Sequence, residues 1–290
     1  MTVMHEPQPY AGASADAIEE HYDVSNEFFR LMLGDTRTYS AALWQDGDTL
    51  DEAQIRKVDY HIEQAGAAGS GRVLDIGCGW GTMVRRLTET HGVQHAVGLT
   101  LSKNQASHIQ GMGLDKVDVR VENWHDHQPE EPYDAIISVG AFEHFVRRYL
   151  SREERVEGFR EFFERCRSWL APGGRLSLQT MAIGNKWRFD RDMIRDANFF
   201  YDTYFKETDL GFFSEIVQAS ERIFDVVSVR VDADHYSRTC QAWLDNLRAN
   251  RAEAIAAAGE EVYLAHERAM AAGVRAYAER FTTLLRISFD

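Results

Sequence analysis

The stretch that most constrains the fold of this 290-residue chain is residues 73–81, where a mostly apolar run leads into three glycines at alternate positions. A helical pattern follows at once, so the sequence predicts a strand, a tight turn and a helix. Without Cβ atoms, Gly77, Gly79 and Gly81 let the backbone turn sharply and approach a ligand. The glycines alone also fit a tight turn that binds nothing. Asp75 lies just before the glycines, and its carboxylate suits a ligand with a cationic amino-acid group better than one with a pyrophosphate. No lysine of a Walker motif follows the glycines, which also argues against a phosphate ligand.

Strand and helix patterns alternate around this turn, which predicts a parallel sheet wound on both faces. The expected strands are 72–77, 94–99, 117–121, 134–139 and 174–181, with helices at 80–90, 102–110 and 153–170. Upstream, Thr49 and Glu52 form a capping-box pattern for a helix that runs to about Ala65. The last elements expected are a helix at 212–220, a strand at 223–231, helices at 236–256 and 260–280, and a strand near 284–289. Ligands of such sheets bind beyond the carboxyl ends of the strands.

Composition narrows the possible partners and the compartment. A net charge of −14 argues against a nucleic-acid partner, because binding phosphates requires concentrated Lys and Arg. No stretch approaches the roughly 20 apolar residues of a membrane span, and the N-terminus does not resemble a signal peptide. Cys78, Cys166 and Cys240 have neither disulfide-framework nor zinc-ligand spacing, which predicts a reduced cytoplasmic protein. His125 and His127 lie in a polar loop without a further ligand, so we expect solvated surface and no metal.

Six motifs in a fixed order identify a family. They are the segments 21–29 (HYDVSNEFF), 38–40 (TYS), 74–81 (LDIGCGWG), 98–105 (GLTLSKNQ), 140–145 (GAFEHF) and 235–236 (HY). With them the chain resembles the cyclopropane-fatty-acid and mycolic-acid cyclopropane synthase family of S-adenosylmethionine (SAM) dependent methyltransferases, from about residue 20 to the C-terminus. The resemblance implies an α/β fold of the Rossmann-like class I methyltransferases, with a mostly parallel seven-stranded sheet, helices on both faces and a helical cap.

The chain is expected to divide into a tail and one domain. Residues 1–13 carry two prolines and small polar residues, which predicts a disordered tail. The resemblance implies that residues 14–290 form a single SAM-dependent methyltransferase domain. Within that domain, residues 14–70 would form a helical lid over the cofactor. Residues 181–221 would form a helical insert on the substrate side.

The family implies SAM as cofactor. The residues that the resemblance assigns to it are Tyr39, Ser40, Asp75, Gly77, Gly79, Gly81, Thr100, Leu101, Gln105, Trp124 and Gly140. Many SAM enzymes carry an acid at the end of the second strand for the ribose hydroxyls, but this chain has Thr100 and Leu101 there. In the cyclopropane synthases Thr100 and Gln105 would take that role as uncharged hydrogen-bonding groups. Trp124 would lie beside adenine, or else serve only as a core or surface tryptophan.

The expected catalytic residues are Glu143, Tyr236, Gln179 and Tyr22. Glu143 stands in an apolar stretch, where an ionised carboxylate requires a partner or a function. It could merely cap the sheet end; the resemblance instead implies that it lies beside the transferred methyl and helps to hold a bicarbonate ion as base. Gln179 replaces the family histidine, and an amide can donate a hydrogen bond but cannot pass a proton. Glu143 could therefore act as the base directly.

The substrate-side insert allows two interpretations. Its basic residues Lys186, Arg188, Arg191 and Arg195 alternate with Asp190, Asp192 and Asp196. They fit a solvated helix face with internal ion pairs, or a site for an anionic group such as a phosphopantetheine or a diphosphate. The aromatic residues Phe199, Phe200, Tyr201, Tyr204 and Phe205 would line a substrate channel or fill the core of the cap.

The resemblance implies a C-methyltransferase that acts on a carbon–carbon double bond of an unsaturated lipid acyl chain, giving a cyclopropane ring or a methylated product. Its substrate would be hydrophobic or amphipathic, presented by a carrier protein or a membrane surface. Alternatives are C-, N- or O-methylation of a smaller metabolite such as an isoprenoid diphosphate or a polyketide, and a SAM-binding protein without transfer chemistry. The oligomeric state stays open.

Overall fold

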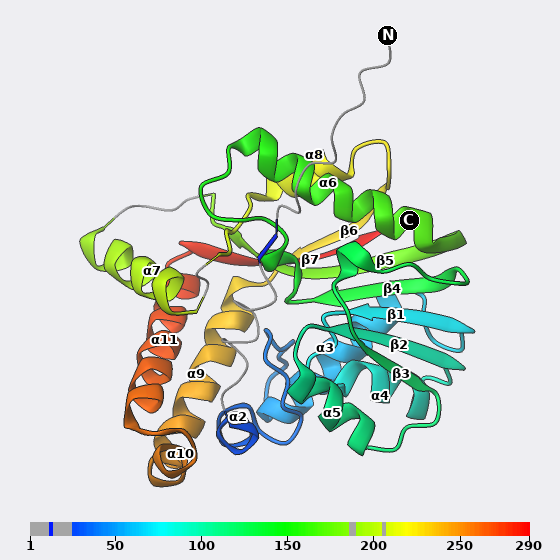
Figure 1. The fold of residues 1–290 in the computed structure, drawn as a ribbon. Helices are drawn as coiled ribbons and strands as arrows, with labels where there is room; N and C mark the ends of the chain where they lie inside the picture. Colours follow the sequence, from blue (N-terminus) through cyan, green and yellow to red (C-terminus); the bar gives the residue numbers. More distant parts are fainter. Residues whose placement is uncertain (1–11, 14–24, 186–189, 205–206) are drawn as a thin grey trace.

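The computed structural model describes residues 12–13, 25–185, 190–204 and 207–290 (Figure 1). The strands are β1 (Arg72–Ile76), β2 (His95–Thr100), β3 (Val117–Val121), β4 (Tyr133–Val139), β5 (Leu170–Ile183), β6 (Val226–Val231) and β7 (Thr282–Phe289). They form one seven-stranded sheet in the order β3-β2-β1-β4-β5-β7-β6. The first five are parallel, and β7 runs antiparallel to both β5 and β6. The expected mostly parallel α/β fold is confirmed.

Helices cover both faces of this sheet. They are α2 (Asn26–Leu33), α3 (Leu50–Gln64), α4 (Thr82–Glu89), α5 (Lys103–Gly111), α6 (Arg152–Trp169), α7 (Arg191–Thr203), α8 (Phe213–Ser220), α9 (Ala233–Ala249), α10 (Arg251–Ala258) and α11 (Glu260–Ala278). Figure 1 shows α6 and α8 on one face and α3, α4 and α5 on the other, while α7, α9, α10 and α11 gather beside the sheet as a cap. No helix in the described ranges is long and apolar enough to cross a membrane.

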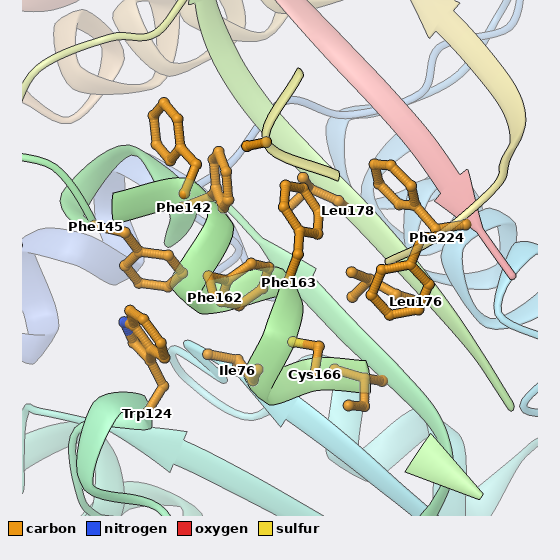
Figure 2. Close-up of a cluster of buried hydrophobic side chains, with 14 of the residues drawn as sticks. Ile76, Trp124, Phe142, Phe145, Phe162, Phe163, Cys166, Leu176, Leu178 and Phe224 are labelled. Carbon is orange, nitrogen blue, oxygen red and sulfur yellow. The ribbon is translucent and has the colours of Figure 1, made fainter. Parts of the chain in front are cut away.

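Three clusters of buried apolar side chains hold these layers together. The largest lies between the sheet and α6, where Phe142, Phe162 and Phe163 pack with Leu176 and Leu178 of β5 (Figure 2). A second fills the opposite face under α3 and α4, and a third joins α2 to the cap helices. Because helices cover both faces of the sheet, β1 and β4 are buried along almost their whole length, and most of their residues are apolar.

Helix ends follow the local sequence closely. Thr49 and Glu52 form the expected capping box at the start of α3, and Ser151 and Glu154 form another at the start of α6. The expected helix 236–256 is instead two helices, because the chain breaks at Asn250. The Asn250 amide donates to the Asn246 carbonyl at 3.0 Å and to that of Leu31 at 3.4 Å, so it ties the break to α2.

The beginning of β5 also differs from expectation. The strand starts at Leu170, which pairs with Tyr133, and its register against β4 then shifts before Ala135 meets Arg175. The Pro172–Gly174 segment is therefore part of an irregular strand start and not a separate connection between α6 and the strand. Gly174 allows this path, because an added Cβ would lie 2.9 Å from the Asp134 carbonyl oxygen.

The order of the strands brings the carboxyl ends of β1, β2 and β4 together. The chain passes from β1 to β2 on one side of the sheet and reaches β4 on the other side of β1. The sheet therefore reverses its strand order next to β1, and the loops that follow these strands diverge there. Such a point opens a crevice in which α/β proteins bind ligands.

Candidate active site

The glycine turn after β1 forms the floor of a cavity at this crevice. Gly77 has φ +84°, and an added Cβ would lie 2.5 Å from the Ala141 Cβ, so only glycine fits. Gly79 also has a positive φ and lines the cavity. Gly81, which caps α4 with φ +87°, does not line it; its missing Cβ admits Ile109 of α5, whose Cγ1 would be 2.7 Å away.

All the other residues expected to bind the cofactor line this one cavity, which we call the cofactor cavity. They are Tyr39, Ser40, Asp75, Gly77, Gly79, Thr100, Leu101, Gln105, Trp124 and Gly140. Asp75 is 2% exposed, and its Oδ2 has no hydrogen-bond partner among the described residues. Burial raises the pKa of Asp75 to about 7. Beside it, Lys57 of α3 donates from Nζ to the Ser40 hydroxyl at 2.8 Å, and burial lowers the Lys57 pKa to about 7.

The other end of the cofactor cavity lies beyond β2 and β3. There Thr100 Oγ1 donates to Gln105 Oε1 at 2.7 Å and accepts from the Ser102 amide at 3.1 Å. Trp124 packs on Phe145 and Phe162, with ring centroids 4.8 and 5.4 Å apart, and also lines the cavity (Figure 2). Trp124 is thus both a core residue and a cavity wall.

His127 does not lie on a solvated surface, and that prediction is wrong. Its side chain is fully buried, because a 3-10 turn (Trp124–Asp126) folds the loop back against Tyr133 and Trp169. His125 keeps partial exposure and pairs with Glu161 at 3.0 Å. No cluster of His, Cys, Asp and Glu in the described ranges could hold a metal ion.

A second, smaller cavity, the reaction cavity, shares Tyr39, Ser40, Gly140 and His144 with the cofactor cavity. Glu143 lines it from a 3-10 turn (Phe142–His144) that follows β4. The Glu143 carboxylate is 3% exposed; Oε1 accepts from the Met181 amide at 2.6 Å, while Oε2 has no partner in the part of the chain that the structure describes. Burial raises the pKa of Glu143 to about 7, against the opposing effect of the Met181 amide.

Gln179 also lines the reaction cavity, and its orientation follows from its neighbours. Arg286 of β7 is fully buried and donates from Nε to Gln179 Oε1 at 2.9 Å. The His61 Nε2 lies 3.3 Å from the same oxygen. Because a guanidinium only donates hydrogen bonds, the amide oxygen must face Arg286. The amide nitrogen is therefore the part of Gln179 that remains for the cavity.

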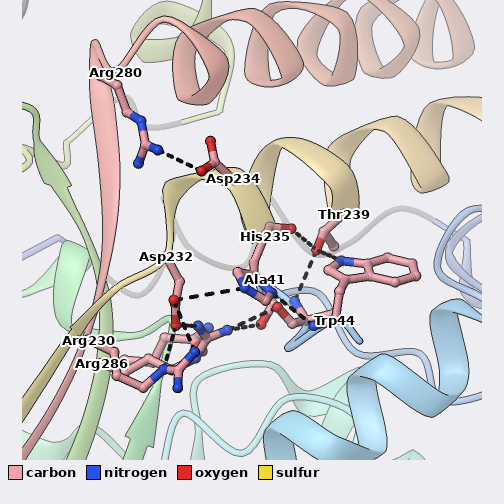
Figure 3. A network of polar contacts seen from close by, with 11 residues as sticks. Ala41, Trp44, Arg230, Asp232, Asp234, His235, Thr239, Arg280 and Arg286 are labelled. Atoms are coloured by element: carbon pink, nitrogen blue, oxygen red, sulfur yellow. Dashed lines mark hydrogen bonds and ion pairs between the residues drawn. The ribbon is translucent and has the colours of Figure 1, made fainter. Parts of the chain in front are cut away.

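Arg286 connects three segments around the reaction cavity (Figure 3). Its Nη1 forms an ion pair with Asp232, at the start of the helix that carries Tyr236. Its Nη2 donates to the carbonyls of Ala41 and Ala42 at 3.2 and 3.0 Å. A single guanidinium thus fixes the loop after Ser40, the Gln179 amide and the start of α9 relative to one another.

Tyr236 and His144 complete the described polar wall of the reaction cavity. The Tyr236 ring stacks on Tyr277, with centroids 4.4 Å apart, and burial raises the Tyr236 pKa well above its usual value. Its hydroxyl therefore stays protonated and can donate. His144 Nδ1 lies 2.8 Å from Thr208 Oγ1, and burial lowers the His144 pKa to about 4, so the ring is neutral. The fourth expected catalytic residue, Tyr22, lies outside the described residues.

A third cavity of about 310 Å³ continues from the reaction cavity between α7 and α11. The two share Met181, Phe200, Gly273 and Tyr277. The rest of its wall is mostly apolar and includes Ile183, Met193, Ile194, Leu210, Phe212 and Phe281. We call it the apolar chamber.

The charges of the insert form ion pairs on α7 and with the neighbouring helix. Arg195 pairs with Asp192 and Asp196 at 3.4 and 3.7 Å, and Asp190 pairs with Arg275 of α11 at 2.9 Å. Of its aromatic residues, Phe200 and Tyr201 line the apolar chamber, and Phe199 and Tyr204 pack into the core of the cap. Lys186, Arg188 and Phe205 lie outside the described residues.

The family model described as mycolic acid cyclopropane synthetase matches residues 11–287 of this chain. The chain belongs to this family. Cyclopropane mycolic acid synthase 1 of Mycobacterium tuberculosis is 37% identical over 260 residues, covering 85% of this chain and 86% of that protein. Hydroxymycolate synthase MmaA4 of the same species is 35% identical over 263 residues, and the match covers 85% of this chain and 82% of MmaA4. Relatives at similar identity thus carry different product names.

A solved structure leads to the same assignment. Mycolic acid cyclopropane synthase CmaA1 in complex with SAH and CTAB superimposes with a TM-score of 0.87 at 30% identity, covering 96% of this chain and 98% of that chain. The expected family, the class I methyltransferase fold and the expectation of a SAM-dependent enzyme are therefore confirmed.

Sequence reasoning missed several residues of this candidate site. Lys57, His61 and Arg286 are buried and polar, and all three contact residues that line the cavities. A signal existed for the first two, because Gln54, Lys57 and His61 recur at helical spacing beside the inward-facing Ala53, Val58 and Ile62 of α3. Arg286 is the one charged residue of the last strand, but its partners are distant in sequence.

Proposed function

We propose that this enzyme transfers the methyl group of SAM to a carbon–carbon double bond in an unsaturated lipid acyl chain. The observation that supports this function is the position of Glu143, a buried carboxylate between the cofactor cavity and the apolar chamber. A basic group at that junction can remove a proton from a carbon held against the cofactor. Removal from the new methyl group closes a cyclopropane ring, whereas removal from a neighbouring carbon leaves a methylated alkene.

The residues of the cofactor cavity fit SAM. When bound, SAM supplies an electrophilic methyl group on a sulfonium. Asp75 offers an unpaired carboxylate oxygen to the ammonium of the methionyl part, next to the open backbone of Gly77 and Gly79. Trp124 provides an apolar wall for adenine. Tyr39, Ser40 and Gly140 would flank the sulfonium side, because they line both the cofactor cavity and the reaction cavity.

The apolar chamber suits an acyl chain. An alkene is a weak nucleophile, so it must be held in line with the methyl group and kept from water. The apolar wall of the chamber would bury such a chain through hydrophobic contacts. Methylation leaves a positive charge on the substrate, which aromatic rings can stabilise. Tyr236, Tyr277 and Phe200 line the cavity in which that charge would form.

Two bases remain compatible with the reaction cavity. Glu143 can accept the proton directly through its unpaired Oε2. Alternatively, the Gln179 amide nitrogen and the Tyr236 hydroxyl would hold a bicarbonate ion beside Glu143, near the positive charge of Arg286. We propose Glu143 as the base and bicarbonate as the alternative.

Delivery of the substrate is part of the proposal. Arg148 lines the apolar chamber, lies over the Tyr201 ring and pairs with Asp202 at 3.3 Å. It could contact an anionic group of the molecule that carries the acyl chain, on a carrier protein or at a membrane surface. The same contact would serve the runner-up substrate, a small isoprenoid diphosphate. We propose a cytoplasmic enzyme, which agrees with the three free, buried cysteines.

An assay of SAH release would test this function. The purified enzyme is incubated with SAM and cis-unsaturated acyl chains, presented as free acids, phospholipid vesicles or carrier-protein thioesters. The masses of the products are measured by mass spectrometry. We expect SAH release that depends on the unsaturated chain, with a product heavier by one CH₂ unit. Saturated chains of equal length are the matched control. Turnover with isoprenoid diphosphates and none with any acyl form would contradict the acyl proposal.

A further inference from the structure

At the adenosine end of the cofactor cavity, the side chains of Thr100 and Gln105 are hydrogen-bonded to each other. Nucleotide-type cofactors present ribose hydroxyls and an adenine amino group, all of which donate. Thr100 and Gln105 were expected to receive the ribose. However, the Thr100 hydroxyl donates to Gln105 and accepts from the Ser102 amide, and the Gln105 carbonyl oxygen accepts from Thr100. Each of these two oxygens therefore keeps a single lone pair for a ligand, and the Gln105 amide nitrogen is a donor.

Glu122 lies beside this pair and lines the same cavity. It is the first residue after β3, and its amide donates to the Thr100 carbonyl at 3.1 Å, so its backbone adjoins the end of β2. Its side chain is 27% exposed and Oε2 lies 3.2 Å from His127 Nδ1. Among the described residues, Oε1 has no hydrogen-bond partner of its own. A carboxylate with free acceptor capacity therefore stands beside this uncharged pair, on the wall of the same cavity.

The orientation of Glu122 is fixed by a buried relay. His127 is fully buried, and its Nε2 lies 3.0 Å from the hydroxyl of Tyr133, which is also fully buried. An ionised carboxylate only accepts, so His127 must carry its proton on Nδ1 and donate it to Glu122. The Tyr133 hydroxyl then donates to Nε2. Burial lowers the pKa of His127 and raises that of Tyr133, which agrees with a neutral imidazole and a protonated phenol.

We propose that Glu122 accepts a hydrogen bond from the adenosine end of SAM and replaces the acid that the second strand lacks. His127 and Tyr133 are positioning residues that hold the carboxylate in place. The ligand group is a neutral donor, either a ribose hydroxyl or the adenine amino group. This proposal rests on SAM as the cofactor and not on the nature of the methyl acceptor.

Calorimetry with SAH tests this role without any methyl acceptor. A hydrogen bond to a charged group contributes about 1.5–3 kcal/mol, so Glu122→Ala is expected to weaken SAH binding by roughly tenfold to a hundredfold. Glu122→Gln should retain part of the affinity, because its amide oxygen still accepts. Asp126→Asn is the matched control, since Asp126 is an acid of the same loop that does not line the cavity.

Analogues of SAH identify the group that Glu122 contacts. The 2′-deoxy, 3′-deoxy and inosine forms of SAH each remove or alter one donor. We expect the affinity loss of Glu122→Ala to vanish or shrink for the analogue that lacks the contacted donor, and to persist for the others. His127→Phe keeps a ring in the buried site and should show a smaller loss with the same dependence on the analogue.

Two results would overturn the proposal. One is wild-type SAH affinity in Glu122→Ala. The other is an affinity loss that is equal for SAH and all three analogues, which would indicate a general disturbance of the cavity. Failure of the lipid-methylation proposal would leave these binding results unchanged, so the two proposals can fail separately.

Discussion

At the scale of single residues, the main feature of the reaction cavity is the buried carboxylate of Glu143. Glu143 is 3% exposed and keeps one oxygen without a partner among the described residues. Ionising such a carboxylate costs folding free energy, and a buried unpaired carboxylate that lines a cavity is therefore a candidate for a functional group. The Met181 amide supports one oxygen and leaves the other for the substrate side.

Glu143→Gln should abolish turnover while SAH still binds. The glutamine oxygen can keep the Met181 hydrogen bond, but an amide cannot accept the proton that the reaction releases. Single-turnover assays and SAH calorimetry on the same preparation measure both effects. A variant that loses SAH affinity together with activity would show that Glu143 belongs to the cofactor site.

The same residue gives a pH-dependent stability. The Glu143 pKa rises from 4.5 to about 7 on folding, so the folded state binds the extra proton between these values. Stability conferred by wild-type Glu143 therefore falls as pH increases through this window, by up to roughly 3 kcal/mol at about 1.4 kcal/mol per unit. Glu143→Gln should gain stability relative to wild type by that amount between pH 4.5 and 7.5 in urea unfolding. A constant difference across this range would argue against a raised pKa.

Gln179→His tests the alternative base. A histidine at this position can share charge and protons with a bound anion, which an amide cannot. We expect the rate of the Gln179→His variant to increase more steeply with added bicarbonate than the wild-type rate. Rates that stay flat in both proteins would remove bicarbonate from the mechanism and leave Glu143 as the base.

At the scale of elements, the turn after β1 decides whether the cofactor cavity exists. Gly77 has a positive φ, and Ala141 occupies the space that a Cβ at position 77 would need. Gly92 also has a positive φ, of 70°, but no atom lies within 4 Å of a Cβ added there. Gly92→Ala should therefore cost only the backbone strain, about 1 kcal/mol. Gly77→Ala adds a clash between two backbone-anchored atoms, and we expect a clearly larger loss in Tm and no measurable SAH binding. Equal losses in the two variants would contradict this reading of the turn.

Local sequence patterns predicted most of the helices and strands, but they predicted few of the contacts between them. The strands and helices around Gly77 could be predicted because apolar periodicity and capping residues such as Thr49 act within one or two turns. The Gln179–Arg286 contact joins residues 107 positions apart. No local pattern signals which buried polar groups will meet across a sheet. His127 was misjudged for a different reason, because the loop folds back and buries the ring against Tyr133, six residues later.

At the scale of the whole molecule, the cap and the sheet together create a continuous interior path. The cofactor cavity lies at the strand ends and the apolar chamber lies between α7 and α11. Glu143 lines the reaction cavity, which shares wall residues with both. The family motif predicted that Tyr39 and Ser40 lie at the cofactor, but not that they also line the reaction cavity. The position of the chamber could not be predicted, since it depends on how the aromatic insert packs on a helix some 70 residues later.

Filling the chamber should separate substrate binding from cofactor binding. Ala272 of α11 lines the chamber, whereas its neighbour Ala271 is exposed. Ala272→Trp is expected to reduce kcat/KM for long acyl chains by at least about tenfold, since it removes apolar volume worth roughly 0.8 kcal/mol per CH₂. SAH affinity should be unchanged in both Ala272→Trp and the control Ala271→Trp. Equal activity of the two variants on long chains would exclude the chamber as the acyl site.

The central claim is that a labelled SAM methyl group ends on the carbon skeleton of an unsaturated acyl chain. The most direct measurement is mass spectrometry of lipids and small metabolites from cells with and without this gene, fed methyl-labelled methionine. We predict acyl chains that gain one labelled carbon only when the gene is present. Unchanged lipids together with a labelled small metabolite would contradict the claim and assign the enzyme to the modification of that metabolite.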